Sequence, residues 1–266
     1  SSYDPESKTT IVTYENSNID IVQNGKVYNI SDIRIRSIEG SKEINSIYFN
    51  NAKAYLSCGF GIVVLDLVRK EIFDTYYVGE NSSKIKVNAV TINDTSIFAA
   101  TVNGLLYAPK SSNALAASQT WQKVQNIANR GITNIEILNI LSLGNGKLLV
   151  NLPIANSTLS DTYTFDGEEW TSVFENEYIK SMRLSEGRLI KISYRSLNIY
   201  DVNNLTNGGE IHHISDEWNP VPGIHLDIND AITDGNDLWL AHETKGLIRI
   251  QNYRYGTSQK SEHFPD

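Results

Sequence analysis

The chain has 266 residues, of which 40% are hydrophobic and 20% are charged, and its formal net charge is −8 at pH 7. The length and the apolar content suit a globular domain with a sizeable core. The acidic balance argues against a nucleic-acid-binding protein and against polybasic docking to anionic lipid.

Short apolar segments separated by turn residues begin at the N-terminus. Residues 10–14, 18–22 and 26–30 match the second, third and fourth strands of a four-stranded unit, with a tight turn at Asn24-Gly25. The first strand of this unit is expected at or before the start of the chain. We therefore expect the chain to begin inside a unit.

The same plan returns five more times, at spacings of 41–51 residues. Each repeat starts with a short apolar strand, and the second residue of that strand is Asn in four repeats and Lys in the other: Asn45, Asn88, Asn139, Lys180 and Asn229. Turn residues rich in Asn, Asp and Gly follow, and they tolerate the positive φ that hairpins need.

Further strands complete the units. Second strands are predicted at residues 54–57, 148–152 and 189–193, third strands at 62–67, 105–108, 162–165, 197–201 and 247–250, and outermost strands at 71–74, 121–124 and 170–173. Residues 111–118 are expected to form one short helical turn in a loop. Residues 251–266 are polar and do not clearly complete a unit.

Four short strands in each 41–51 residues are typical of β-propeller blades. A helical solenoid is the rival fold at this spacing, and the period-two alternation and Asn-Gly or Asp-Gly turns exclude it. We predict an all-β fold, a β-propeller of four-stranded antiparallel blades with six units visible. The ring has six blades, or it is a larger ring, such as one of seven blades, with one missing. We expect residues 1–266 to form a single β-propeller domain of a longer multidomain protein.

The sequence contains no motif of a catalytic or phosphate-binding site. Gly59-Phe60-Gly61 is a lone Gly-x-Gly, for which a tight connection between strands is the favoured interpretation. Cys58 is the single cysteine and is interpreted as a small buried residue. Glu168 and Glu169 follow an Asp166-Gly167 turn and are interpreted as a solvated loop.

Metal ligation is weighed for two groups of residues. The pair His212-His213, with Asp216 and His225, fits no zinc spacing. The acidic residues of the last repeat do not follow the calcium-loop pattern and are interpreted as turn residues: Asp227, Asp230, Asp234 and Asp237. We expect no metal and no cofactor.

Four tryptophans could stack on sugars. Trp121, Trp170 and Trp239 occupy repeat positions, where core packing is expected. Trp218 lies outside the strand pattern, in Asp216-Glu217-Trp218-Asn219-Pro220. It is the candidate for an exposed ligand or partner contact.

Two resemblances sharpen these expectations. Asp234-Gly235-Asn236-Asp237-Leu238-Trp239-Leu240, followed by Lys245-Gly246-Leu247, resembles the two-component-regulator propeller repeat, with Ala241 in place of the usual Gly. Residues 18–20, 25–30 and 54–79 resemble the N-terminal β-propeller of the PorZ-like family of type IX secretion system proteins. That resemblance implies a longer, exported protein of the cell surface or periplasm in the Bacteroidetes, with a sortase partner and anionic lipopolysaccharide as ligand.

The resulting functional hypothesis is a non-catalytic binding and scaffolding propeller of a bacterial cell-envelope assembly. The alternative is a periplasmic glycan-sensing propeller of a hybrid two-component regulator. A third hypothesis, a propeller lyase or glycosidase, requires three or more histidines or carboxylates to converge. No nucleic-acid partner and no membrane-spanning segment are expected.

Overall fold

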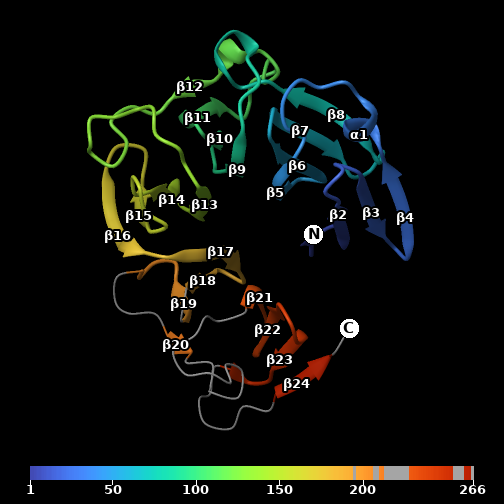
Figure 1. The fold of residues 1–266 in the computed structure, drawn as a ribbon, viewed down its shortest axis with the longest axis vertical. Coiled ribbons are helices and arrows are strands. Elements are labelled where there is room, and N and C mark those ends of the chain that lie inside the picture. The colour runs from blue at the N-terminus through green and yellow to red at the C-terminus, as the bar shows by residue number, and fades with distance from the viewer. Residues whose placement is uncertain (194–195, 206–209, 213–227, 254–260, 265–266) are drawn as a thin grey trace. The chain divides into compact units, whose positions relative to one another are not determined.

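The computed structural model describes residues 1–193, 196–205, 210–212, 228–253 and 261–264. These residues form six four-stranded antiparallel sheets, and the strands of each sheet are neighbours in the order in which they follow along the chain. Figure 1 shows this succession of sheets from the N-terminal to the C-terminal end. The predicted β-propeller fold is confirmed.

Three sheets and part of a fourth belong to one compact unit, residues 1–153 and 163–172. The first sheet contains β1 (Ser2–Asp4), β2 (Thr9–Thr13), β3 (Ile19–Gln23) and β4 (Lys26–Ile30). The second contains β5 (Ile44–Asn50), β6 (Lys53–Cys58), β7 (Gly61–Asp66) and β8 (Glu71–Tyr76). The third contains β9 (Val87–Ile92), β10 (Ser96–Thr101), β11 (Gly104–Pro109) and β12 (Gln122–Lys123).

The boundary with the second compact unit, residues 154–162 and 173–266, runs through the fourth sheet. That sheet contains β13 (Asn139–Gly144), β14 (Lys147–Pro153), β15 (Ser160–Phe165) and β16 (Trp170–Glu177). The fifth contains β17 (Ile179–Ser185), β18 (Arg188–Ser193), β19 (Leu197–Asp201) and β20 (Glu210–His212). The sixth contains β21 (Ile228–Asp234), β22 (Asp237–His242), β23 (Gly246–Ile250) and β24 (Ser261–Phe264).

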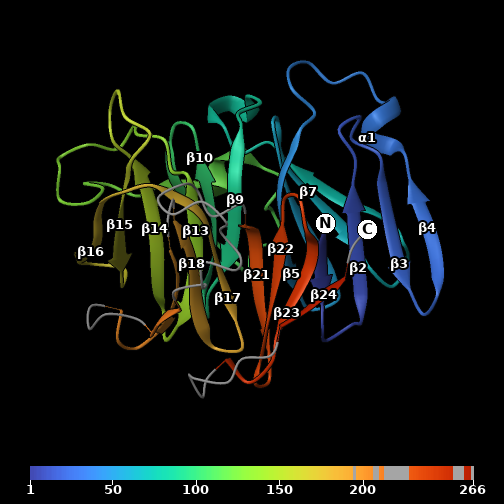
Figure 2. The same cartoon turned by 60° about the horizontal axis from the view of Figure 1, so that its bottom comes forward.

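The structure differs from the sequence prediction at both ends of the chain and in its helices. β1 supplies the first strand of the first sheet, so the expectation that the chain begins inside a unit is wrong. β24 completes the sixth sheet from a segment with no clear strand pattern. The helix α1 (Asp32–Ile35), next to the end of β4 in Figure 2, has no counterpart in the sequence prediction. The helical turn expected at residues 111–118 is wrong, because the 3-10 turn comes later, at η2 (Ser118–Thr120); another, η1 (Glu80–Ser82), precedes β9.

The hydrophobic core lies between consecutive sheets. In the first unit, separate buried clusters join the first and second sheets, the second and third, and the third and fourth; in the second unit a cluster joins the fifth and sixth. Strand β7 contributes to two clusters, with Val63 and Leu65 facing the first sheet while Ile62 and Val64 face the third. Burial on both faces explains why this strand is a continuous apolar run.

The repeated Asn marks a β-bulge. In four sheets the pairing of the first and second strands skips the second residue of the first strand: Asn45, Asn88, Lys180 and Asn229. Asn139 does not follow this rule and pairs with Asn151. In the first unit the bulge directs an amide toward the next sheet. Asn45 Nδ2 donates to the carbonyl oxygen of Val87 in β9, and Asn88 Nδ2 donates to that of Ile137, just before β13, both at 2.8 Å.

Candidate functional site

A groove of about 500 Å³ lies between the third and fourth sheets of the first unit. Its floor is formed by buried apolar side chains, among them Phe98 from β10, Leu148 from β14 and Trp170 at the start of β16. Phe165 stacks on Trp170 with ring centroids 4.4 Å apart. These residues belong to the cluster that joins the two sheets, so the groove opens directly onto the core.

Two turns build the polar rim of the groove. In the turn from β9 to β10, Asn93 Oδ1 accepts hydrogen bonds from the backbone N–H groups of Thr95 and Ser96. In the turn from β15 to β16, Asp166 Oδ1 accepts from the N–H groups of Glu168 and Glu169. Both are side-chain-capped turns of the kind that Asn and Asp favour, which explains these residues at strand ends.

The rim of the groove carries both negative and positive side chains, and the negative ones outnumber the positive. Asp166 and Glu168 are exposed, and the backbone N–H groups of Glu169 and Glu168 hold the pKa of Asp166 below its ordinary value. Lys123, on β12, donates to Asn134 Oδ1 at 2.7 Å. The amide of Gln125 and the hydroxyl of Tyr107 add neutral hydrogen-bonding groups. This arrangement suits the binding of a small polar molecule that also offers an apolar face.

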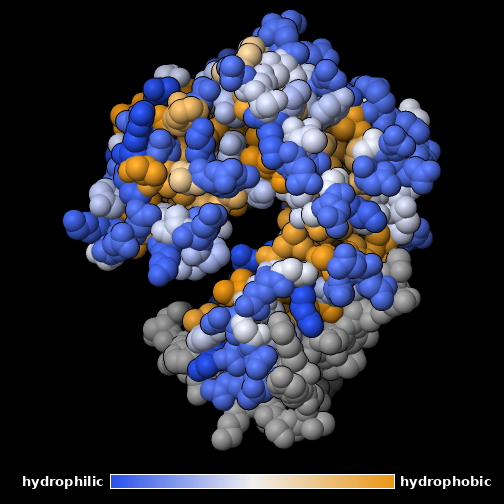
Figure 3. All heavy atoms as spheres, turned by 180° about the vertical axis from the view of Figure 1, so that it is seen from behind, coloured by the Kyte–Doolittle hydropathy of each residue, from blue (hydrophilic) through white to orange (hydrophobic). Residues whose placement is uncertain are grey.

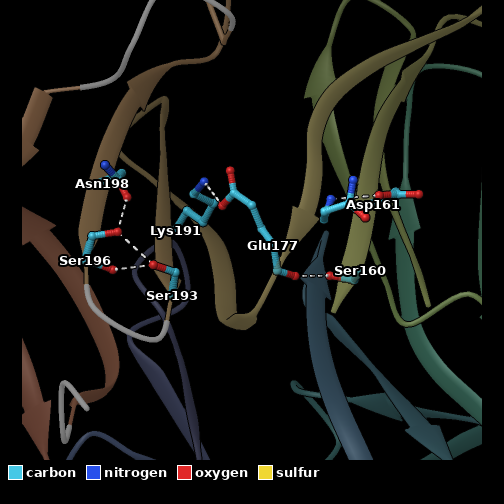
Figure 4. A network of polar contacts seen from close by, with 8 residues as sticks. Ser160, Asp161, Glu177, Lys191, Ser193, Ser196 and Asn198 are labelled. Carbon is cyan, nitrogen blue, oxygen red and sulfur yellow. Dashed lines mark hydrogen bonds and ion pairs between the residues drawn. The ribbon is translucent and has the colours of Figure 1, made fainter. Parts of the chain in front are cut away.

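A second polar cluster lies in the other unit, around Lys191 of β18. Only 3% of the Lys191 side chain is exposed, and its Nζ pairs with the Glu177 carboxylate, which is 34% exposed. Figure 4 shows the two side chains pointing toward each other from β18 and β16. The ammonium also lies 3.9 Å from the ring centroid of Phe174 and 5.5 Å from that of Tyr200.

The electrostatics of this cluster follow from its burial. Desolvation lowers the pKa of Lys191, and the hydrogen bond and charge of Glu177 partly oppose that effect. Burial, with a smaller contribution from the Glu177 charge, raises the pKa of Tyr200 to about 12. Aromatic faces and a carboxylate together compensate a buried ammonium, which is the usual arrangement of a structural ion pair.

Further hydrogen bonds flank the ion pair of Lys191 and Glu177. The carbonyl oxygen of Glu177 accepts from Ser160 Oγ at 3.3 Å. On the other side, Ser196 Oγ lies 2.7 Å from Ser193 Oγ and donates to Asn198 Oδ1 at 2.8 Å (Figure 4). None of these groups is placed to activate Lys191 as a nucleophile, so we assign the cluster to packing between β16 and β18.

The interpretations of Cys58 and of the Gly-x-Gly are confirmed. Cys58 is fully buried, and desolvation raises its pKa to about 12. Gly59 and Phe60 form the two-residue connection from β6 to β7. Gly61 has φ 143°, and a Cβ there would collide with the carbonyl oxygen of Tyr76, so the connection requires glycine.

Two of the four acidic residues have ion-pair partners: Asp230, which lies within β21 and not in a turn, and Asp237, at the start of β22. Asp230 accepts a hydrogen bond from Arg183 at 2.5 Å, and Asp237 accepts from Arg249 Nε at 2.8 Å, which lowers the pKa of Asp237. Among the described residues, no three His, Cys, Asp or Glu side chains come together as a metal site. The interpretation of Glu168 and Glu169 as exposed turn residues is confirmed.

The four tryptophans differ in their surroundings. Trp121 and Trp170 are buried in the core as expected, and Trp121 Nε1 donates to the carbonyl oxygen of Leu115. The expectation of core packing is wrong for Trp239, which is partly exposed with the Arg249 guanidinium 5.4 Å from its ring. Trp218, with Asp216, His213, His225 and Asp227, lies outside the described residues, and its contact with a ligand remains a prediction.

Sequence reasoning missed the groove and Lys191. The groove joins residues 93–98 to residues 165–170, and only packing of the two sheets brings them together. Lys191 carried a usable signal, because a single charged residue stands inside the apolar run Leu189-Ile190-Lys191-Ile192. Figure 3 shows apolar residues among polar ones on one face. Exposed apolar side chains include Val27, Ile35 and Val68.

The sheets and their order define a β-propeller domain, and comparison with known proteins agrees. Residues 1–122 match the family model described as the N-terminal β-propeller domain of PorZ of the type IX secretion system. The expected resemblance to that family is therefore confirmed over these residues. No curated protein matches the chain significantly.

Solved structures share the fold over the whole chain. PorZ, described as an essential bacterial surface component of the type-IX secretion system of Porphyromonas gingivalis, is 17% identical with a TM-score of 0.69, over 99% of this chain and 32% of that one. The extracellular domain of the hybrid two-component system BT3049 of B. thetaiotaomicron is 11% identical with a TM-score of 0.64, over 100% of this chain and 34% of that one. The extracellular domain of the one-component system BT4673 of B. thetaiotaomicron is 14% identical with a TM-score of 0.64, over 99% of this chain and 36% of that one. The chain thus spans about a third of the length of these proteins. Within its described residues, no helix has the length and apolar character to cross a membrane.

Proposed function

We propose that this chain is a non-catalytic binding and scaffolding β-propeller of a bacterial cell-envelope protein related to PorZ. The observation that carries the proposal is the match of residues 1–122 to the PorZ N-terminal propeller family. The relatives with known structures are described as a surface component and as extracellular domains, which supports an exported location at the cell surface or in the periplasm.

Finer statements belong to the same proposal. Residues 1–266 form one propeller domain of a longer multidomain protein. Its partners are proteins of an envelope assembly, including a sortase, and its ligand is an anionic lipopolysaccharide, as the family resemblance implies. Trp218 is the proposed contact residue. The net charge of −8 supports recognition of proteins or glycans rather than of nucleic acid.

The proposal is tested in the native bacterium with an epitope tag inserted into the chromosomal gene. We expect the protein to be labelled by a membrane-impermeant reagent or released with the periplasm, and to be captured after in-cell crosslinking together with other envelope proteins. Recovery in the cytoplasmic fraction, or capture without any envelope protein, would contradict the proposal.

A second candidate is a periplasmic glycan-sensing propeller of a hybrid two-component regulator. The observation that favours it is the fold similarity to the extracellular domain of BT3049. Deletion of the gene separates the two candidates. An assembly component leaves glycan-induced transcription intact and alters the proteins displayed at the surface, whereas a sensor shows the reverse.

A further inference from the structure

We propose that the groove between the third and fourth sheets binds an uncharged saccharide of one or two rings. The proposal goes beyond the envelope function and does not depend on it, because the groove is formed by this chain alone. Its position, at the edge of the core cluster and open to solvent, makes it accessible without any rearrangement of the sheets.

Aromatic side chains line the floor of the groove: Phe98, Phe165 and Trp170 each expose 7% of their surface, and Tyr107 is partly exposed. Phe165 and Trp170 stack with an interplanar angle of 21°, and Phe98 stacks with Tyr107 at a centroid distance of 6.0 Å. Sugar rings have one apolar face of C–H groups, and that face would contact the exposed parts of these rings, chiefly Tyr107. A volume of about 500 Å³ lies within the range of small-molecule sites.

The rim provides hydrogen-bonding groups that match hydroxyls. The Thr95 hydroxyl, the Gln125 side-chain oxygen and the Glu168 carboxylate are exposed at the groove, while Gln125 Nε2 already donates to the carbonyl oxygen of Lys123 at 3.0 Å. Carboxylates and amides are well suited to sugar hydroxyls because they accept or donate in pairs. The polar groups surround the aromatic floor, as expected for a ligand with a polar circumference and an apolar face.

The charge of the rim selects against acidic ligands. The rim carries two carboxylates, those of Asp166 and Glu168, and one ammonium, that of Lys123. The Lys123 ammonium already donates to Asn134. The low pKa of Asp166 keeps its charge at neutral pH. An anionic sugar would meet like charges and lose affinity. The ligand of this groove is therefore neutral, in contrast to the anionic lipopolysaccharide proposed for the protein as a whole.

Ligand-observed NMR and calorimetry on the full chain test this site. The probes are neutral hexoses, N-acetylhexosamines and 6-deoxyhexoses with their disaccharides, and the matched pair of glucose and glucuronic acid. We expect at least one neutral probe to bind with a dissociation constant of about 1 mM or tighter. We expect glucuronic acid to bind more weakly than glucose.

Two adjacent residues offer a matched pair of blocking variants. Thr95 lines the groove and its neighbour Asp94 does not, and both are exposed in the same turn. Thr95→Trp should fill the groove and weaken binding by about tenfold or more, while Asp94→Trp should leave it unchanged. Thermal unfolding of both variants checks that the fold is kept.

Glu168 and Glu169 give a second pair that does not depend on steric block. Only Glu168 lines the groove, and the side chains of both are exposed. Glu168→Gln should improve binding of glucuronic acid relative to glucose more than Glu169→Gln does. Failure of every neutral probe to bind at about 10 mM, or equal weakening by Thr95→Trp and Asp94→Trp, overturns the proposal. Either result leaves the envelope function standing, because that function is tested by location and crosslinking.

Discussion

Asn45 donates its side-chain amide to the backbone carbonyl oxygen of Val87 at 2.8 Å, and so ties the first strand of the second sheet to the first strand of the third. Asn88 repeats the contact one sheet further on, at Ile137. In both sheets the Asn is the residue that the β-ladder skips. The residue that the bulge leaves unpaired in its own ladder thus provides a hydrogen bond toward the next sheet.

Replacing these amides should destabilise the protein. Asn45→Ala leaves a carbonyl oxygen without its donor at the fully buried residue Val87, and a loss of about 1–3 kcal/mol in the free energy of unfolding is expected. Urea unfolding followed by circular dichroism measures this loss. The control is Asn103→Ala in an exposed turn, which should change stability by less than about 0.5 kcal/mol. Equal effects of the two substitutions would show that the link contributes nothing.

The ion pair of Lys191 and Glu177 predicts non-additive substitutions. Glu177→Gln leaves a buried ammonium without its counter-charge and should cost about 1–3 kcal/mol of stability. Lys191→Met should cost less, because Glu177 is partly exposed and regains water. The double substitution should be more stable than the sum of the single effects implies, since it removes the buried charge altogether. A double-mutant cycle with additive effects would be the contrary result.

Burial of Cys58 predicts both slow thiol chemistry and a pH effect. Between the ordinary value of 9.0 and the folded pKa of about 12, the folded protein keeps the thiol proton that the unfolded chain has lost. Stability should therefore fall as pH rises through this window, by up to about 1.4 kcal/mol per pH unit from this group. Urea midpoints measured from pH 8 to 10 should fall less steeply for Cys58→Ala.

An independent test of the same burial uses a thiol reagent at neutral pH. Cys58 should react at the rate of unfolding and become fast only in denaturant. Immediate reaction in the native protein would mean that the thiol is accessible.

Gly61 should be far less tolerant of substitution than Gly25. Both have positive φ, of 143° and 70°, but a Cβ at Gly61 would collide with the carbonyl oxygen of Tyr76, while no atom lies near that of Gly25. Gly25→Ala should cost about 1–2 kcal/mol for the left-handed backbone alone. Gly61→Ala should cost clearly more, because β8 must also shift. Thermal unfolding compares the two, and similar losses would remove the steric argument.

Most strands could be predicted because each of these carries its own signal. Alternation and turn residues placed β5, β9, β17 and β21 at their observed starts, and β19 with both of its ends. The helix α1 has only four residues, with Ile33 its one buried side chain, and no periodicity can develop over such a length. The strands β1 and β24 are short, and each pairs with a single neighbour, so packing imposes little pattern on them.

The groove could not be predicted because its two halves are separated by about 70 residues of chain. Thr95 and Glu168 look alike in sequence, as polar turn residues with no distinguishing motif. What makes them neighbours of one cavity is the packing of Phe98 against the cluster that includes Phe165 and Trp170, a property of the folded core alone. The repeated Asn was visible in the sequence, but its bulge and its hydrogen bond were not.

The groove takes its floor from strands and its rim from turns, and this division has an evolutionary consequence. Floor residues such as Trp170 are held by the requirements of the core, whereas Thr95 and Glu168 are exposed and free to vary. Descendants of this domain can therefore change what they recognise by exchanging a few turn residues, without crossing a barrier of lost stability.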